Sequence, residues 1–482
     1  MNLKQLRPSL FILPLGLLLL GGPGLARSLP EFVRDIKVPP LQIDPPRPTV
    51  ETLASGAKLI SAPDDSLPFL TLRFEFEGGT NAEPVAHNGR LEAMAELMEI
   101  GGAGSRSGDE VAEALARIGA KLETSADYES WSVSLTVLKA DFDTGFGILS
   151  DVLLRPRFPE ERLAVVKNSF LTGIKQRNDR PADIARRKLT EVLYGDLRSG
   201  TAIQVENVKR LTVADLKAEH KRRLSTGKLW IALSGDFAGL NIKERSAKLL
   251  EGLPRDSTLK IEDARRSKNP FTKRILLVKR PAAQATIMAG TYLPAHNNPD
   301  FYALQTGNYI LGGGSFNSRL MREIRTERGL AYYAYSYNRF LKQGGTFYAG
   351  SGTRVNAAAE TVGLLLKLVG EMPRNLQAAE LNLAREAILN SMVFQYASPA
   401  SLVSSEIRFR RHGMPENYLK VFADKVRALS VRDVEKVFGR RLAPGDLSIV
   451  VVGPESLKTE LSKLRPVVVV DPEAVDFRDR LK

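Results

Sequence analysis

The second half of this chain repeats the first half. The segment LTVADLKAEHKRRLSTGKLWIALSGDF begins at Leu211 and the segment LSVRDVEKVFGRRLAPGDLSIVVVGPE begins at Leu429, which is an offset of 218 residues (429 − 211). Each segment predicts a capped helix followed by a strand that ends at a glycine. Because a repeat of this length corresponds to a whole domain, it constrains the fold before any local motif is considered.

A second pair of segments supports the same repeat. Residues 142–156 and 159–173 predict two helices separated by proline, and residues 357–373 and 378–391 predict the same arrangement. Two similar pairs of segments in the same order and at a similar offset are not explained by chance. We therefore predict two copies of one domain.

The apolar patterns within each copy predict its fold class. Alternating apolar residues at 57–62, 70–76 and 121–137 predict strands, and helical spacing at 88–100 and 108–118 predicts the helices between them. This order indicates an α+β domain with a mostly antiparallel sheet and packed helices, not a doubly wound domain. The predicted organisation is a signal peptide at 1–26, a Pro-rich arm at 27–44, an N-terminal domain at 45–245, a charged linker at 246–269, a C-terminal domain at 270–465 and a tail at 466–482.

The N-terminal segment predicts export. Lys4 and Arg7 precede the apolar run LFILPLGLLLL, and the small residues of GGPGLAR follow it. This is the layout of a secretory signal peptide, with cleavage expected near Ala26, and an uncleaved anchor is the alternative. The chain has no cysteine, which excludes disulfides, thiol catalysis and cysteine–zinc sites. An exported protein without disulfides indicates the periplasm of a Gram-negative bacterium.

The charge of the chain does not by itself predict a partner. The formal net charge is +14, and a basic balance favours acidic partners such as nucleic acid or an anionic membrane. The basic residues are spread along the chain, and no nucleic-acid-binding motif accompanies them. We therefore predict no nucleic-acid partner, and no stable membrane span after the signal peptide is removed.

The sequence contains no local histidine motif for zinc. Glu92, Glu96 and Glu99 share one face of the predicted helix at 88–100, where clustered carboxylates could hold a hard cation. A solvated helix face is the interpretation that we favour. No G-x-S-x-G motif occurs, and the glycines at 312–314 are not followed by the Gly-Lys-Ser/Thr of a phosphate loop, so they predict a turn that leads into a helix. The four histidines, which are interpreted as surface or packing residues, are His87, His220, His296 and His412.

The stretch LGGGSFNSRLMREIRTERGLAYYAYSY at 311–337 concentrates polar recognition chemistry. Arg325 precedes Tyr332 by seven residues, and further tyrosines follow at 333, 335 and 337. A guanidinium is a fixed-charge fork for carbonyl or carboxylate oxygens, and a phenol can donate a hydrogen bond to a developing oxyanion. The spacing alone favours a surface arginine and a packed tyrosine.

Both halves of the chain resemble a known family. Residues 66–79 (SLPFLTLRFEFEGG), residues 108–154, the pair Tyr194-Gly195 and the segment SFNSRLMREIRTERGLAYYAYSY follow the order found in the insulinase/pitrilysin superfamily of zinc peptidases. The closest resemblance is to its branch similar to mitochondrial processing peptidase, and it covers about residues 45–465. It implies two tandem homologous domains with the processing-peptidase-like metallohydrolase fold.

The resemblance also implies that the zinc motif is degenerate in this chain. Active members carry H-x-x-E-H on a helix of the first domain. Aligned through the flanking glycines, the two histidines and the catalytic glutamate are replaced by Glu92, Glu96 and Ala95, respectively. The family's remaining zinc ligand, a glutamate, would fall near residues 172–173, where there is none. We expect this chain to bind no metal or other cofactor, and we expect zinc in a partner subunit.

The resemblance assigns a different role to the second domain. In the family, an arginine and a tyrosine seven residues apart reach the substrate bound at zinc, and Arg325 and Tyr332 match them. The expected function is a non-catalytic subunit of a heterodimeric periplasmic zinc metallopeptidase, with a homologous zinc-bearing subunit and a peptide or unfolded polypeptide as partners. A catalytically inactive peptide-binding or structural scaffold is the alternative. A weaker third possibility is a residual metalloenzyme that uses His87, Glu92 and Glu96.

Overall fold

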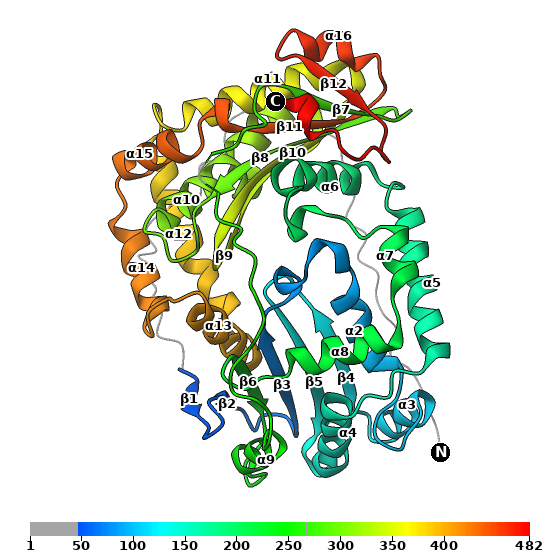
Figure 1. Ribbon diagram of the computed structural model, residues 1–482. Helices are drawn as coiled ribbons and strands as arrows, with labels where there is room; N and C mark the ends of the chain where they lie inside the picture. The colour runs from blue at the N-terminus through cyan, green and yellow to red at the C-terminus, as the bar shows by residue number, and fades with distance from the viewer. Residues whose placement is uncertain (1–46, 267) are drawn as a thin grey trace, which may run out of the picture. The chain divides into compact units, whose positions relative to one another are not determined.

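Two six-stranded sheets form the framework of residues 47–266 and 268–482, which the computed structural model describes (Figure 1). The predicted signal peptide and Pro-rich arm lie outside these residues. The first sheet has the order β1 (Thr49–Thr52), β2 (Lys58–Pro63), β6 (Leu229–Gly235), β3 (Phe69–Glu77), β5 (Ser130–Leu138) and β4 (Lys121–Ala126). The second sheet has the order β12 (Val467–Val470), β7 (Ile275–Lys279), β11 (Ser448–Gly453), β8 (Gln284–Leu293), β10 (Gly344–Arg354) and β9 (Ala331–Leu341).

Both sheets are mostly antiparallel, which confirms the predicted α+β class. In the first sheet only β2 and β6 are parallel, and in the second sheet β7 is parallel to β11 and β12. The first half contributes α2 (Arg90–Ile100), α3 (Gly108–Arg117), α4 (Phe142–Leu154), α5 (Glu160–Gln176), α6 (Pro181–Tyr194), α7 (Val205–Arg210), α8 (Val213–Arg223) and α9 (Ile242–Leu249). The second half contributes α10 (Phe301–Asn308), α11 (Ala358–Glu371), α12 (Ala378–Gln395), α13 (Pro399–Arg411), α14 (Tyr418–Ala428), α15 (Val431–Arg441) and α16 (Leu457–Ser462).

The helices confirm the internal repeat. The first residues of α5, α6 and α8 precede those of α12, α13 and α15, respectively, by 218 positions in every case (378 − 160, 399 − 181 and 431 − 213). The helix caps repeat as well, because the hydroxyls of Thr212 and Ser430 accept hydrogen bonds from the backbone N–H groups of Asp215 and Asp433. Such caps satisfy N–H groups that the first helical turn leaves unpaired. The same local sequence therefore starts the same helix in both halves.

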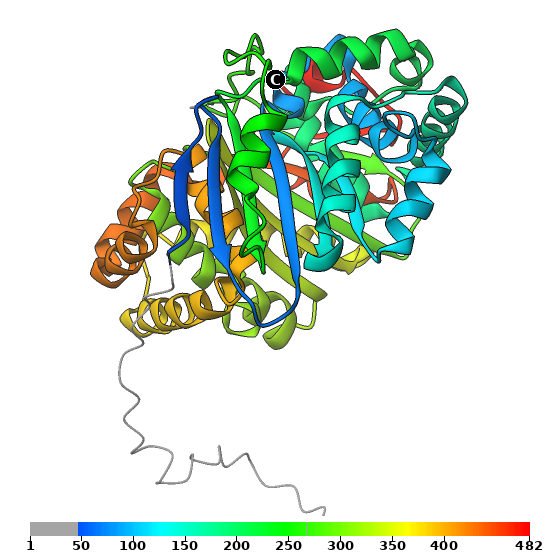
Figure 2. The same cartoon turned by 90° about the horizontal axis from the view of Figure 1, so that it is seen from below.

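Each half covers the other half's sheet with one helix. Leu189 and Leu193 of α6 are buried in one cluster with Met288 and Val450 of the second sheet. In the reciprocal arrangement, Val403 and Ile407 of α13 are buried against Ile60 and Trp230 of the first sheet. Figure 1 shows α6 beside β8 and β10, and α13 beside β6, and Figure 2 gives the view from below. This exchange joins the two halves through apolar cores rather than through the linker alone.

Polar contacts add to this connection between the halves. The Tyr194 hydroxyl lies 2.8 Å from Thr346 Oγ1, and it donates to the Gly345 carbonyl at 3.1 Å. Arg411, at the end of α13, is hydrogen-bonded to Glu75 of β3. Because buried polar groups require partners, these contacts fix the position of α6 on the second sheet and of α13 on the first sheet.

Candidate functional site

The first candidate site lies on α2, which carries the degenerate zinc positions. A buried carboxylate caps this helix, because Glu83 accepts hydrogen bonds from the backbone N–H groups of Gly89 at 3.2 Å and Leu91 at 2.8 Å. A negative charge at a helix N-terminus is favourable since the helix dipole is positive there. Burial and the nearby Glu92 nevertheless raise the pKa of Glu83, against the opposing effect of Arg198.

Glu92 forms an ion pair in place of the first metal ligand. Its Oε1 accepts a hydrogen bond from Arg198 at 2.6 Å, and the same guanidinium donates from Nε to Glu83 at 2.8 Å. Burial opposes the charge of Arg198, but the two carboxylates outweigh it and raise the pKa of this guanidinium. A guanidinium therefore already pairs with Oε1 of Glu92, and its buried Oε2 has no hydrogen-bond partner among the described residues. Sequence reasoning did not identify Arg198, because the residue lies more than a hundred positions from Glu92.

The remaining carboxylates of α2 also have partners within the chain. A hydrogen bond joins Glu96 to Ser169 of α5, and burial raises the pKa of Glu96. Glu99 accepts from the backbone N–H of Thr124 at 2.8 Å, and the Thr124 hydroxyl donates to the Ala95 carbonyl at 2.6 Å. These bonds hold α2 against β4, an edge strand of the first sheet. Glu92 and Glu96 are therefore half-buried structural contacts, whereas Glu99 is exposed, as the predicted solvated face requires.

These residues do not fit a zinc ion. Structural and catalytic zinc sites require at least three histidine, cysteine or carboxylate ligands that converge on one point. Within residues 47–266 and 268–482, no three such side chains are grouped so that they could hold a metal. Glu92 and Glu96 point to different partners, Ala95 offers no base, and the exposed Gly173 has no side chain. That the purified chain binds no metal remains a prediction.

The second candidate site contains Arg325 and Tyr332. Arg325 lies in the π-helical segment η7 (Met321–Glu327), and Tyr332 lies in β9. Thr353 of β10 pairs with Ala331 and the preceding Gly352 pairs with Tyr333, so Tyr332 is left out of the ladder as a β-bulge. A bulge redirects its side chain. Tyr332, at this bulge, is 80% exposed.

The structure brings Arg325 and Tyr332 together. Arg325 Cζ lies 5.3 Å from the centroid of the Tyr332 ring, and 5.0 Å from that of Phe316, which the sequence reasoning had not singled out. No side-chain hydrogen bond or ion pair is made by Arg325 to any other described residue. The guanidinium donors and the Tyr332 hydroxyl are therefore available to an external ligand. No hydrogen bond, ion pair or ring contact between described residues joins Arg325 or Tyr332 to Glu92, Ala95 or Glu96 of α2.

The glycines at 312–314 determine how this segment packs. Gly312 and Gly313 end the π-helical segment η5 (Tyr309–Gly313), which continues from α10. A Cβ atom on Gly312 would lie 2.3 Å from the backbone nitrogen of Ser336 in β9. Only a glycine permits this close approach of a helix to a strand edge. The three-glycine stretch ends one helix against β9 before the chain enters η6 (Ser315–Asn317) and η7, so it is a packing turn.

The other tyrosines of β9 form a separate structural row. The rings of Tyr333, Tyr335 and Tyr337 stack at centroid distances of 5.9 and 6.0 Å, and Tyr337 stacks on Tyr348 at 4.8 Å. Burial raises the pKa of Tyr337 to about 12, so its hydroxyl stays protonated at neutral pH. The tyrosines of this row stack on one another, whereas Tyr332 does not belong to the row.

The histidines are not gathered near either candidate site. His220, His296 and His412 are buried, and His87 is exposed in a surface hollow lined by Arg90, Arg210 and Asp215 among others. His296 and His412 form a hydrogen-bonded pair with a 2.8 Å distance between their Nδ1 atoms. Two arginines beside His87 disfavour a cation there, which speaks against a residual metal site with Glu92 and Glu96.

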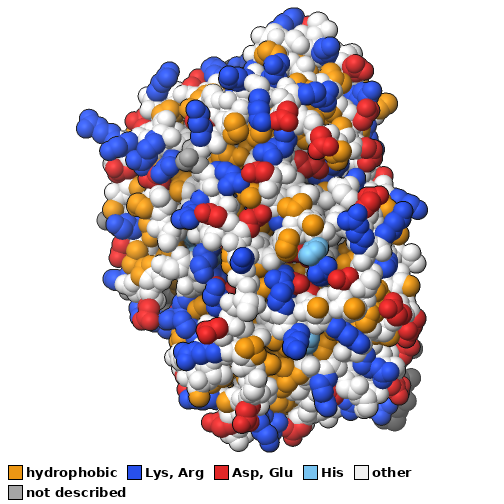
Figure 3. Space-filling view, in the orientation of Figure 1, with side chains coloured by type: hydrophobic (Ala, Val, Ile, Leu, Met, Phe, Trp, Pro, Cys, Tyr) orange, Lys and Arg blue, Asp and Glu red, His pale blue; other side chains and the backbone are white. Residues whose placement is uncertain are grey.

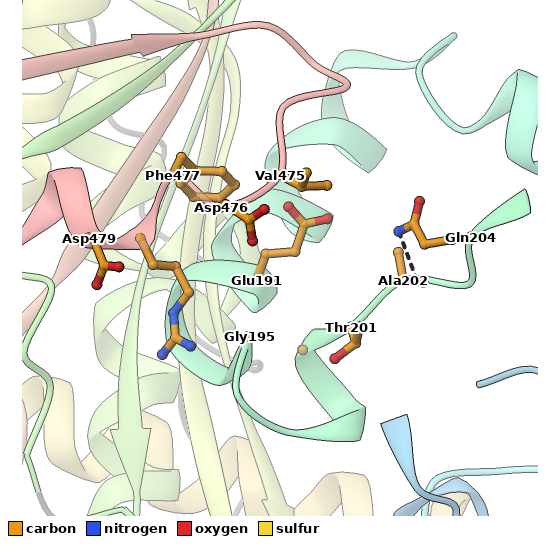
Figure 4. A pocket seen from close by; sticks show the side chains of 11 residues that line it. Glu191, Gly195, Thr201, Ala202, Gln204, Val475, Asp476, Phe477 and Asp479 are labelled. Atoms are coloured by element: carbon orange, nitrogen blue, oxygen red, sulfur yellow. Dashed lines mark hydrogen bonds between the residues drawn. The ribbon is translucent and has the colours of Figure 1, made fainter. Parts of the chain in front are cut away.

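A surface pocket of about 310 Å³ is lined in part by side chains that already have partners within the chain. It lies between the C-terminal end of α6, the segment 200–204 and the tail residues 475–479 (Figure 4). The Glu191 carboxylate in its wall already accepts hydrogen bonds from Arg187 and Lys188, both at 2.8 Å. The dashed bond in Figure 4 joins Gln204 to the Ala202 carbonyl, so this amide is also engaged.

The surface shows no concentrated basic area on the face in Figure 3. Lys and Arg side chains are spread among Asp and Glu there, as the sequence predicted. No helix within the described part of the chain is long and apolar enough to cross a bilayer.

Two family models match this chain. The model described as insulinase (peptidase family M16) matches residues 59–204, and the model described as peptidase M16 inactive domain matches residues 210–388. Together these matches span more than half of the 482 residues. The chain therefore belongs to the insulinase family, peptidase family M16, and it is a member that lacks the catalytic motif.

Curated relatives include both zinc proteases and a non-peptidase. An uncharacterised zinc protease of Mycobacterium tuberculosis is 25% identical over 381 residues, which is 76% of this chain and 84% of the relative. The non-peptidase homologue YmxG of Helicobacter pylori is 22% identical over 395 residues, which is 80% of this chain and 89% of the relative. Family membership is therefore compatible with either an active or an inactive protein.

Solved structures agree with the fold. The structure of a peptidase M16 inactive domain from Pseudomonas fluorescens has a TM-score of 0.77 and 27% identity, and it covers 85% of this chain and 98% of that chain. The periplasmic protease PqqL of Escherichia coli has a TM-score of 0.68 and 17% identity. That match covers 87% of this chain but only 48% of PqqL.

Proposed function

We propose that this chain is the non-catalytic subunit of a heterodimeric zinc metallopeptidase in the periplasm. Its second half would supply Arg325 and Tyr332 to the active site of a zinc-bearing homologous subunit, and its first half would serve as a scaffold. The main support is the contrast between the two candidate sites. Glu92 pairs with Arg198 at the zinc positions, whereas the half-buried Arg325 and the exposed Tyr332 are adjacent and make no side-chain hydrogen bond or ion pair to the described residues.

The chemistry of the pair fits the binding of a peptide at a partner's metal. The guanidinium of Arg325 can donate two parallel hydrogen bonds to a carbonyl or carboxylate oxygen of the substrate. The Tyr332 hydroxyl can donate to the oxyanion that forms when water attacks the scissile carbonyl. Neither group can activate water, so catalysis requires the metal and the base of another subunit.

The match to PqqL supports a two-subunit arrangement. Most of this chain aligns with about half of that single-chain periplasmic protease. A complete enzyme of this fold can thus contain twice as much protein as this chain provides. The same comparison, together with the signal-peptide pattern at 1–26, supports a periplasmic location.

Co-purification from the native host, followed by reconstitution, tests the proposal. The zinc-bearing partner alone, this chain alone and their mixture are assayed with a fluorogenic peptide library. We expect activity in the mixture that neither subunit shows alone. Arg325→Ala and Tyr332→Phe should each lower this activity by about one to three orders of magnitude, the range for losing one oxyanion-type donor.

Matched controls separate the proposed roles from general effects. Arg328→Ala removes an exposed arginine three residues from Arg325, and Tyr337→Phe removes a hydroxyl on the same strand as Tyr332. Both controls should retain full activity, and all four variants should still form the complex. If the complex forms but gains no activity, a peptide-binding scaffold is favoured instead. The same holds if Arg325→Ala and Tyr332→Phe both keep full activity.

A further inference from the structure

Phe316 is an exposed aromatic residue beside an arginine that has no ion pair in the described part of the chain. Phe316 is 64% exposed and follows the glycines at 312–314. Arg325 Cζ lies over its ring at 5.0 Å and over the Tyr332 ring at 5.3 Å. Two rings from different segments, η6 and β9, therefore meet one guanidinium from η7.

The backbone on either side of Phe316 is well restrained. Ser315 has φ 52, in the left-handed region that residues with a side chain rarely adopt. Its carbonyl accepts hydrogen bonds from the backbone N–H of Ser318 at 3.1 Å and from the Ser318 hydroxyl at 2.7 Å. A Cβ atom on Gly314 would lie 2.7 Å from the Tyr309 ring, so the turn is packed against the preceding helix. An uncommon conformation held by several contacts is typical of functional positions.

The acidic residues near Arg325 pair with another arginine, and the guanidinium of Arg325 lies against the two rings. Arg322 lies 3.8 Å from a carboxylate oxygen of Glu323 and 3.5 Å from one of Glu327, so it pairs with both acidic residues of η7. An ion pair would occupy the N–H donors of Arg325. A cation–π contact uses the ring faces instead and leaves the donors at the guanidinium edge free.

We propose that Phe316 is a positioning residue, which with Tyr332 forms an aromatic clamp that orients Arg325 toward the substrate. This inference rests on the function proposed above. The clamp restricts the long arginine side chain before the substrate arrives, so that less conformational entropy is lost on binding. It also keeps every guanidinium donor available for a peptide oxygen.

Kinetics of the reconstituted complex test the clamp. Phe316→Leu keeps an apolar side chain but removes the ring, and it should lower kcat/KM by about two- to thirty-fold, the range for one cation–π contact. Phe316→Tyr should retain activity because it keeps the ring. Once Arg325 is replaced by alanine, Phe316→Leu should have no further effect. Phe394→Leu, at an 83% exposed phenylalanine of α12, is the matched control and should be silent.

Side-chain NMR of Arg325 in the isolated chain provides a readout that needs no partner. Ring currents should shift the arginine signals, and Phe316→Leu should move them toward free arginine, whereas Phe394→Leu should not. Unchanged arginine signals in Phe316→Leu would overturn the clamp even if the complex is active. The clamp would also be overturned if the losses of kcat/KM in Phe316→Leu and Arg325→Ala multiply in the double variant. A shifted arginine in a complex that never becomes active would instead refute the proposed function, and with it the clamp's role in substrate binding.

Discussion

Acidification should weaken the contact that His296 and His412 make between the two halves of the chain. His412 Nε2 lies 2.8 Å from a carboxylate oxygen of Glu129, in the loop between β4 and β5, and the Tyr418 hydroxyl lies 3.3 Å from His296 Nε2. An ionised carboxylate only accepts hydrogen bonds, so His412 donates from Nε2, and while His412 is neutral its Nδ1 accepts from His296 Nδ1. His296 Nε2 then accepts from Tyr418, and a second proton on His296 would remove this acceptor and place a charge in a buried site.

The size of the effect follows from the burial of His296. Burial, followed by the positive charge of His412 when it is protonated and by the charge of Arg408, lowers the pKa of His296 from 6.5 to about 3, against the opposing charge of Glu129. Below pH 6.5 the unfolded chain therefore binds a proton that the folded chain does not bind. The resulting stability is present above pH 6.5 and is lost at about 1.4 kcal/mol per pH unit as the pH falls toward 3. Between pH 7 and pH 5 the loss is about 2 kcal/mol.

Urea unfolding at pH 7 and pH 5 measures this difference. The wild type, His296→Phe and His87→Phe are compared, since a phenylalanine suits the aromatic surroundings of His296 and His87 is exposed. We expect the loss of unfolding free energy between the two pH values to be about 2 kcal/mol smaller in His296→Phe than in the other two proteins. His220, whose pKa burial also lowers, contributes equally to all three. A wild-type pH dependence in His296→Phe would show that the burial of His296 does not cause the loss of stability.

Glu129 titrates below this pH range. Burial alone would raise the pKa of Glu129, but the hydrogen bond and the charge of His412, with smaller effects of Lys342 and Arg411, keep it below 4.5. Its stabilising contribution is therefore present above pH 4.5 and is lost at lower pH. The interval from pH 7 to pH 5 therefore lies above the range in which Glu129 titrates, and the comparison with His296→Phe isolates the contribution of His296.

Two further predictions concern the degenerate zinc site and the packing glycines. The combined changes Glu92→His, Ala95→Glu, Glu96→His and Gly173→Glu should produce one tightly bound zinc per chain, measured by elemental analysis after dialysis, whereas the same protein with Gly173 retained should hold less. A folded fourfold variant without zinc would contradict the assigned ligand positions. Gly312→Ala should destabilise the chain by about 1–3 kcal/mol in urea unfolding because its Cβ would meet the backbone of β9. Gly173→Ala in α5, where a Cβ would meet nothing within 4 Å, should stabilise it by about 0.5–1 kcal/mol, and equal effects would contradict the packing role of Gly312.

Much of the fold could be predicted because local patterns and the repeat agree. The two helices predicted within residues 142–156 and 159–173 are α4 and α5, and α5 begins one residue later and ends three residues later than the predicted segment. The exchange of α6 and α13 could not be predicted, since an amphipathic helix has the same apolar pattern whichever sheet it covers. Only the contacts of Leu189 and Val403 with the opposite halves reveal it.

The α+β class, the repeat, the family and the loss of the H-x-x-E-H residues could be predicted from the sequence, because each depends on residue identity and spacing along the chain. The contacts of Glu92 and Arg325 could be found only from the folded structure. Glu92 pairs with Arg198, which the fold brings from a distant segment, and a bulge in β9 places Tyr332 beside Arg325. These pairings depend on how strands and helices pack together. The number of residues between two side chains does not give the distance between them in the folded protein. The same holds for Phe316, whose ring reaches Arg325 only through the packed turn after the glycines.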